Sequence, residues 1–167
     1  MYYGSADGYK TYQVAHGRVI PTTLTDTEIE SALLVASEWL DFRYGTAFIG
    51  TKTNGFLQER EWPRKNAVVQ EYPSYTFEDY EIPTQVVNAT YEAALRQLED
   101  KGCLSTDYTP PKYKSVSVSG AVAVEYATFD GAFSAQKQIP VVDSLLSSLL
   151  DPHAEDYADF SGKVARL

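Results

Sequence analysis

The side chains best placed for chemistry lie in QEREWPRKN, residues 58–66, where charges of both signs surround one tryptophan. Arg60, Arg64 and Lys65 all lie within three positions of Trp62. Aromatic rings beside cationic side chains can stack on the bases of single-stranded nucleic acid while the cations contact its phosphates. This stretch is therefore one candidate for a binding surface.

The same stretch also fits a structural role. A buried indole contributes on the order of 2–3 kcal/mol to stability, so Trp62 can anchor a long loop. Pro63 stiffens the chain beside it, and Arg64 can pair with a carboxylate. Glu59 and Glu61 interrupt the basic residues and weaken any positive patch. We therefore predict that Trp62, Pro63 and Arg64 form a loop anchor, and we keep stacking on nucleic acid as the alternative.

Side chains suited to catalysis or metal binding are scarce. His16 and His153 have no second histidine or cysteine at the spacing of metal ligands, and Cys103 is the only cysteine. The carboxylates within 78–81 and 155–159 fall in polar stretches, where solvated charge is the ordinary state. We predict no catalytic residue, no metal and no cofactor, and hence a protein that is not an enzyme.

One long helix is clearly marked in the sequence. Thr25 and Glu28 have the spacing of a capping box, and apolar residues then recur every three or four positions. This pattern predicts a helix over 26–44. Gly45 is expected to end it, because glycine tolerates the left-handed conformation common at helix ends.

Three more helices are expected. An apolar stripe that follows Pro83 predicts a helix over 83–100. A short helix capped by Asp7 is expected over 6–16, and a short amphipathic helix over 140–150.

A β-hairpin is expected between the helix over 83–100 and the helix over 140–150. Apolar residues alternate with small polar ones on both sides of a Ser-Gly turn, a pattern typical of two paired strands over about 113–128. A two-stranded hairpin is marginal alone, so it should pack on the helices or on another chain.

Two segments lack a core pattern. Residues 45–82 have no long periodic stretch, and a connection of this length in a compact domain is often functional. The stretch after residue 150 predicts an extended arm over 151–167. The fold class is thus mainly α: a small helical bundle over 1–150 with an appended β-hairpin, followed by an extended C-terminal arm.

Composition limits the partners. The formal net charge is −9, which repels a nucleic-acid backbone unless the few cations gather on one face. The chain has 13 tyrosines, whose apolar rings and polar tips suit surfaces that become buried against partners. No run approaches the roughly 18 apolar residues that span a bilayer, so no membrane association is expected.

Several short motifs resemble a family of tailed-bacteriophage proteins. They are SALLVASEWLDFRYG, FIGTKTNG leading into EWPR, YEIP, ATYEAALRQLED, the hairpin and VDSLLSSLL, and they occur in this order over about residues 5–150. Many members are labelled DnaT-like single-stranded-DNA-binding proteins. They also look like the head–tail connector, or adaptor, proteins that form a ring beneath the portal.

The resemblance implies a structural virion protein as the main expectation. It implies a homo-oligomeric ring of twelve copies at the neck of the virion, made in the host cytoplasm and joined to the portal protein. A head-completion or tail-terminator protein would bind below, and DNA would pass through the channel without specific binding.

We expect the hairpin and the arm to make the subunit or portal contacts, because an open hairpin edge can be paired by another chain. The residues expected at these contacts are Tyr113, Val116, Val118, Val122, Val124, Tyr126, Tyr157, Phe160, Arg166 and Leu167. The alternative function is a phage single-stranded-DNA-binding accessory protein. It predicts salt-sensitive binding that weakens when Arg60, Arg64 or Trp62 is replaced. A small enzyme is a third interpretation, for which the sequence names no reactive pair.

Overall fold

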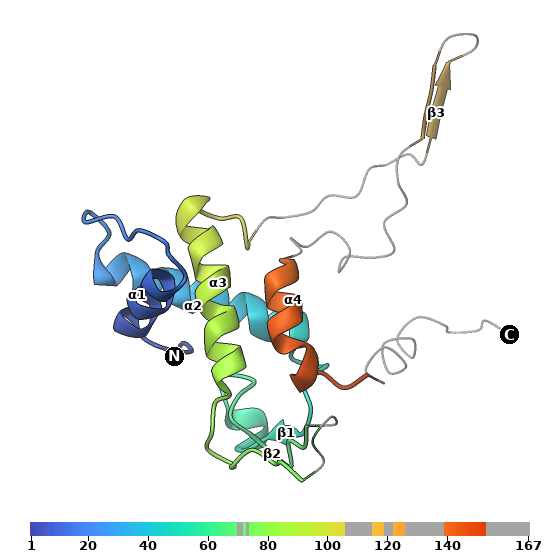
Figure 1. The fold of residues 1–167 in the computed structure, drawn as a ribbon. Helices are drawn as coiled ribbons and strands as arrows, with labels where there is room; N and C mark the ends of the chain where they lie inside the picture. The colour runs from blue at the N-terminus through green and yellow to red at the C-terminus, as the bar shows by residue number, and fades with distance from the viewer. Residues whose placement is uncertain (70–71, 73, 106–114, 119–121, 126–138, 153–167) are drawn as a thin grey trace, which may run out of the picture.

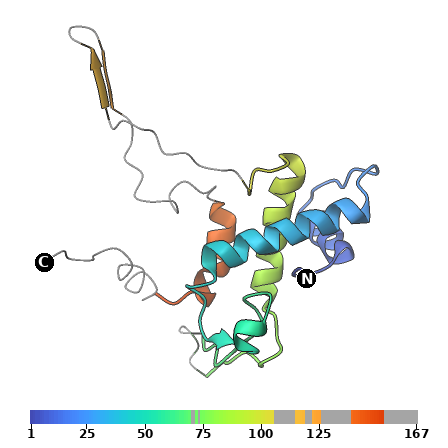
Figure 2. The same ribbon diagram turned by 180° about the vertical axis from the view of Figure 1, so that it is seen from behind.

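The computed structural model describes residues 1–69, 72, 74–105, 115–118, 122–125 and 139–152. Within this part of the chain the body consists of α1 (Ala6–Ala15), α2 (Asp26–Tyr44), α3 (Thr84–Glu99) and α4 (Pro140–Leu146). Helices α3 and α4 run side by side in opposite directions, and α2 crosses both (Figures 1 and 2). The predicted mainly α bundle is confirmed.

Helix α2 has the predicted span, but Gly45 after it does not have the predicted conformation. The Thr25 hydroxyl accepts a hydrogen bond from the Glu28 N–H (3.3 Å), and the Glu28 carboxylate accepts one from the Thr25 N–H (3.0 Å), which confirms the capping box. Gly45 has a right-handed φ of −55°, so the expected left-handed stop was wrong. A Cβ at this position would lie 2.4 Å from the Asp41 carbonyl oxygen and 2.8 Å from Glu61 Cγ. Glycine is needed here for space.

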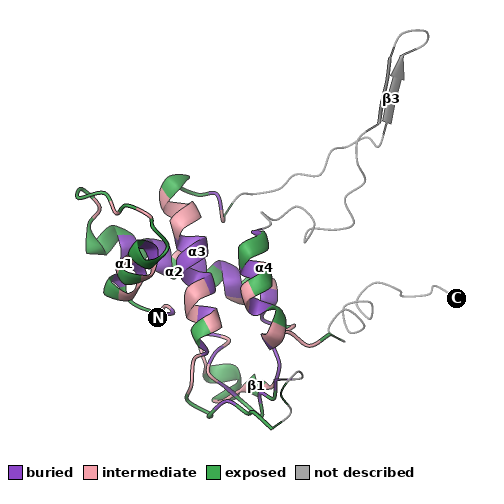
Figure 3. Ribbon diagram, in the orientation of Figure 1, coloured by how far each residue is buried: buried purple, intermediate pink, exposed green. Residues whose placement is uncertain are grey.

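The hydrophobic core lies where α2, α3 and α4 meet. Buried positions concentrate on the faces of α2, α3 and α4 that turn toward one another (Figure 3). Fully buried members of this core include Ile29, Leu33, Leu40, Val86, Ala89, Val142 and Leu146. Their three- and four-residue spacing places them on one face of each helix, as the sequence pattern requires.

Helix α1 is held against α3 by tyrosine contacts. Its N-cap is Ser5, whose hydroxyl accepts from the Gly8 N–H at 3.0 Å, so the expected Asp7 cap was wrong. The Tyr91 ring from α3 packs edge-on against Tyr9 with ring centroids 6.0 Å apart, and its hydroxyl accepts from the Ser5 N–H at 3.2 Å. The side chain of Tyr91 thus links the two helices.

A buried carboxylate ties the chain between α1 and α2 to α3. Glu92 is 1% exposed and accepts hydrogen bonds from Arg18 (2.8 Å), Tyr12 (3.1 Å) and Arg96. Burial disfavours its charge, but the bonds from the two arginines outweigh burial and keep the pKa of the Glu92 carboxyl below its ordinary value. The cluster is satisfied internally.

Short elements join the helices. Between α2 and α3 lie β1 (Thr51–Lys52), the 3₁₀ helix η1 (Gly55–Leu57) and β2 (Arg64–Lys65), with β1 and β2 paired antiparallel. After α4 the chain continues as the 3₁₀ helix η3 (Ser147–Leu149). The Leu149 carbonyl oxygen then accepts from the Ile49 N–H at 3.0 Å, which fixes the end of this segment to the chain after α2.

The predicted hairpin is confirmed in its backbone as β3 (Ser115–Val118) and β4 (Val122–Glu125). The arm expected over 151–167 lies outside the described residues except for its first two, and the boundary at residue 150 stays a prediction. None of the helices in the described ranges has the length and hydrophobicity needed to cross a bilayer.

Candidate functional site

The segment 45–82 forms one end of the molecule, beside the N-terminus of α3 and the C-terminus of α4 (Figure 1). We call this segment the aromatic end. It contains the tryptophan and the arginines singled out in the sequence.

Trp62 faces the core. Its side chain is fully buried, and its ring packs edge-on against Phe48 and Phe77, each with centroids 5.7 Å away. The backbone N–H of Trp62 also donates to the Tyr3 hydroxyl at 3.0 Å. The indole cannot stack on a base in this arrangement, because both of its faces lie inside the protein.

Arg64 serves the backbone of the loop. It is 7% exposed, and its guanidinium donates to the carbonyl oxygens of Ile49 (2.8 Å) and Gly50 (2.8 Å) and to the Glu61 carboxylate (2.8 Å). Pro63, between these two anchors, is partly buried. Arg64 therefore has no free donor face for a phosphate.

Arg60 is also committed inside the protein. It is 5% exposed, donates to the Met1 carbonyl oxygen at 2.6 Å and lies 3.4 Å from the carboxylates of Asp41 and Glu38. Burial raises the pKa of the Asp41 carboxyl, although hydrogen bonds from Tyr3 and Arg60 act in the other direction. The three side chains that the DNA-binding alternative named are thus all buried.

Other aromatic side chains at this end are exposed. The exposed fractions are 100% for Phe56, 67% for Tyr72, 49% for Tyr75 and 80% for Tyr80. Elsewhere in the described part of the chain, Phe42 on α2 is the only exposed phenylalanine, tyrosine or tryptophan. The sequence signal that points to these residues is their place among turn formers and polar residues, away from any helical stripe.

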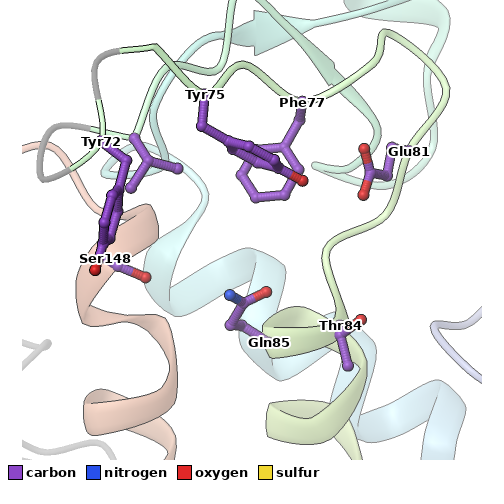
Figure 4. Close-up of a pocket in the computed structure, with 8 residues that line it drawn as sticks. Tyr72, Tyr75, Phe77, Glu81, Thr84, Gln85 and Ser148 are labelled. Atoms are coloured by element: carbon purple, nitrogen blue, oxygen red, sulfur yellow. The ribbon is translucent and has the colours of Figure 1, made fainter.

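Two of the exposed rings overhang a cleft of about 480 Å³ between the loop, the N-terminal end of α3 and η3. In Figure 4, Tyr72 stands next to Ser148, Tyr75 and Phe77 form the roof, and the Gln85 side chain rises from α3 toward them. The remaining lining residues are Val69, Glu81 and Thr84. The cleft combines apolar rings with a few polar groups, as small-ligand sites do.

Free positive charge is sparse at this end. Lys52 pairs with Glu61 at 2.8 Å, while Lys65 is exposed and makes no ion pair with any described residue. Glu78 and Asp79 are exposed. Stacking is therefore the chemistry this surface supports best. In the described ranges no group of three or more His, Cys, Asp or Glu side chains is placed to hold a metal ion.

A protein family described as "Putative DnaT-like ssDNA binding protein" matches residues 2–167. The chain belongs to this DnaT-like family. No curated protein and no solved structure matches it. The family resemblance seen in the sequence is confirmed at this level.

Membership of the DnaT-like family corrects the main functional expectation. The head–tail connector role was wrong, because the matching family is described by single-stranded-DNA binding, which was the alternative. The twelve-membered ring and its portal contact stay predictions, since the structure holds one chain.

The residues expected at interfaces of this DnaT-like protein are only partly described. The hairpin register pairs Val116 with Val124 and Val118 with Val122. Their side chains lie outside what the structure describes, and so do all atoms of Tyr113, Tyr126, Tyr157, Phe160, Arg166 and Leu167. Their role stays a prediction.

Proposed function

We propose that this chain is a phage-related protein that binds single-stranded DNA and catalyses no reaction of its own. The observation that carries the proposal is the match of the whole chain, residues 2–167, to the DnaT-like family. The proposal concerns binding, so the structure has to offer a surface for bases and a source of phosphate contacts.

The aromatic end supports base stacking. Stacking of a base on an aromatic side chain contributes about 1–3 kcal/mol and tolerates any sequence, because every base has a π face. Phe56, Tyr72, Tyr75 and Tyr80 are all exposed within this one segment. A single strand can bring successive bases to such a surface, whereas the bases of a duplex are already stacked on each other.

The charge distribution predicts that stacking dominates over phosphate binding. Most arginines and lysines of the described residues are in ion pairs, and only Lys65 and Lys101 make none. Each phosphate neutralised on a single strand contributes roughly 0.7 to the salt slope. We therefore expect a shallow slope, with a magnitude of about 2 or less.

One further segment has the composition for phosphate contacts. Residues 108–138 hold three lysines and two acidic residues, a net charge of +1 in a chain whose total is −9. The same segment holds five aromatic residues: Tyr108, Tyr113, Tyr126, Phe129 and Phe133. Basic residues interleaved with aromatic ones are typical of surfaces that follow a single strand.

Fluorescence anisotropy with a labelled oligothymidylate at about 50 and 200 mM salt tests the proposal. We expect tighter binding to the single strand than to a duplex of the same length. Phe56→Ala combined with Tyr80→Ala should weaken binding about tenfold or more, because two stacking platforms are lost. Phe42→Ala is the matched control, since Phe42 is 69% exposed but lies on α2.

Lysine variants separate phosphate contacts from stacking. Replacing Lys112 and Lys114 together by Gln should reduce the magnitude of the salt slope by about 1, whereas Lys101→Gln should leave it unchanged. The absence of any single-strand binding by the folded protein at the lower salt would refute the proposed function.

A further inference from the structure

The cleft under Tyr72 and Tyr75 has walls whose positions are fixed by backbone bonds. The Tyr75 N–H donates to the Tyr72 carbonyl oxygen at 2.8 Å, so the two tyrosines lie at the two ends of one turn. The Phe77 N–H donates to the Ala67 carbonyl oxygen at 3.2 Å, and Val68 pairs with Thr76 as an antiparallel bridge. The turn is thereby tied to the chain segment at Ala67 and Val68 that precedes it.

A ladder of edge-on aromatic contacts connects this turn to the core. Tyr75 packs against Phe77 at 5.1 Å and 89°, Phe77 against Trp62 at 5.7 Å and 79°, and Trp62 against Phe48 at 5.7 Å and 74°. Phe77, Trp62 and Phe48 are buried, whereas Tyr75 is 49% exposed. The ladder therefore presents one tyrosine ring at the surface in a fixed orientation, which lowers the ordering cost of stacking a ligand on it.

Two polar side chains in the lining of the cleft are available to a ligand. The Gln85 amide makes no hydrogen bond with any described residue, and it points toward the aromatic rings (Figure 4). Glu81 accepts one 3.4 Å bond from the Glu78 N–H through Oε2 and keeps Oε1 for another donor. The lining thus offers an amide from α3 that both donates and accepts and a carboxylate from the loop that only accepts, and these groups can match the edge of a base.

We propose that this cleft holds one unstacked base of a DNA single strand and prefers cytosine to thymine. The inference rests on the proposed single-strand binding and names the part of the ligand that enters the cleft. The volume of about 480 Å³ lies within the roughly 300–1,000 Å³ typical of small-molecule sites, which leaves room for one base and part of its sugar.

The preference follows from the hydrogen-bonding groups of the two pyrimidines. Cytosine carries an amino group that can donate to Glu81, and its ring nitrogen and carbonyl oxygen can accept from the Gln85 amide. Thymine presents a carbonyl oxygen where cytosine has the amino group, so it would place an acceptor against the Glu81 carboxylate. Both pyrimidines can stack on Tyr75 equally, and stacking alone would give no preference.

The test compares labelled oligodeoxycytidylate and oligothymidylate of equal length, by anisotropy with the full chain at neutral pH. We expect the cytosine oligomer to bind about fivefold or more tightly. Glu81→Gln should remove this ratio, since the amide can donate to the thymine oxygen as well as accept. Tyr75→Ala should weaken both oligomers about tenfold. Tyr80→Ala, outside the cleft lining, should weaken both without changing their ratio.

The outcomes separate this inference from the proposed function. If neither oligomer binds, both proposals fail. If both bind with equal affinity, or if Glu81→Gln leaves the ratio unchanged while circular dichroism shows an intact fold, only the base assignment fails. Gln85→Ala is a second test of the base assignment. If the Gln85 amide bonds to the base edge, this variant should reduce cytosine binding more than thymine binding.

Discussion

The helical body and the aromatic end use the same residue types in opposite ways. In the body, the hydroxyl groups of Tyr3, Tyr12 and Tyr44 donate to the carboxylates of Asp41, Glu92 and Asp143. At the aromatic end, Tyr72, Tyr75 and Tyr80 are exposed, and their hydroxyl groups make no hydrogen bond within the described ranges. Tyrosine content alone therefore says little about where a binding surface lies.

Charged residues show the same contrast. Arg18, Arg60 and Arg64 are each held by carboxylates or carbonyl oxygens, so they stabilise the fold and have few donors left for a ligand. The exposed rings of Tyr72, Tyr75 and Tyr80, in contrast, lie outside the helices. This difference indicates that the helical body provides rigidity. Recognition of a ligand then depends on side chains that make no bonds within the fold.

Trp62 lies at the junction of the two regions, and its removal should have the largest effect. Trp62→Ala leaves a cavity between Phe48 and Phe77 and should lower the free energy of unfolding by about 3–5 kcal/mol. Urea denaturation followed by circular dichroism measures this change. Trp62→Phe should cost less, because it keeps an aromatic ring between the same neighbours. A loss below about 1 kcal/mol for the alanine variant would show that the anchor is not needed.

Within the body, Glu92→Gln should have the next largest effect. The change removes the charge that Arg18 and Arg96 share, and we expect a loss of about 2 kcal/mol at neutral pH. The value is below that of a fully buried pair, because Arg18 and Arg96 are 34% and 27% exposed. Lys10→Gln, which breaks the exposed pair with Asp26, is the matched control and should cost less than about 1 kcal/mol.

The same carboxylate predicts a pH dependence. The folded pKa of Glu92 lies below its ordinary value of 4.5, so its ionised form is favoured more by the folded state than by the unfolded one. Its contribution is complete above pH 4.5 and is lost as the pH falls through the folded pKa. As the pH is lowered from neutral through the folded pKa of Glu92, the free energy of unfolding should therefore fall less for Glu92→Gln than for the wild type. Parallel pH curves for the two proteins would contradict this.

Local patterns made much of the fold predictable from the sequence. The span 26–44 of α2 was predicted because both of its signals, the capping box and the apolar stripe, lie within the helix and its cap. The strands of the hairpin were predicted from period-two alternation around Gly120. The apolar stripe after Pro83 predicted α3 for the same kind of reason, and Pro83 is its N-cap residue.

Contacts between distant residues were not predictable. Arg64 is buried because it reaches the carbonyl oxygens of Phe48, Ile49 and Gly50, and no sequence spacing announces a side chain bonded to backbone. Gly45 was assigned a conformational role, whereas the restriction is one of space, set by the Asp41 carbonyl oxygen and by the side chain of Glu61, sixteen positions away. Tyr72 and Tyr75 were visible as residues, but the cleft that they line depends on the approach of Ser148 in η3, far along the chain.

Replacing Phe56 should give the smallest change in the free energy of unfolding. It therefore separates the binding role of the aromatic end from the structural role of the body. Its side chain is fully exposed on η1, and Phe56→Ala should change the free energy of unfolding by less than about 0.5 kcal/mol. Affinity for a single strand should nevertheless fall by about 1 kcal/mol, because a stacking ring is lost. Urea denaturation and anisotropy on the same preparation measure both quantities. A variant that loses stability but keeps its affinity would place Phe56 with the structural aromatic residues, and the division between body and binding end would have to be redrawn.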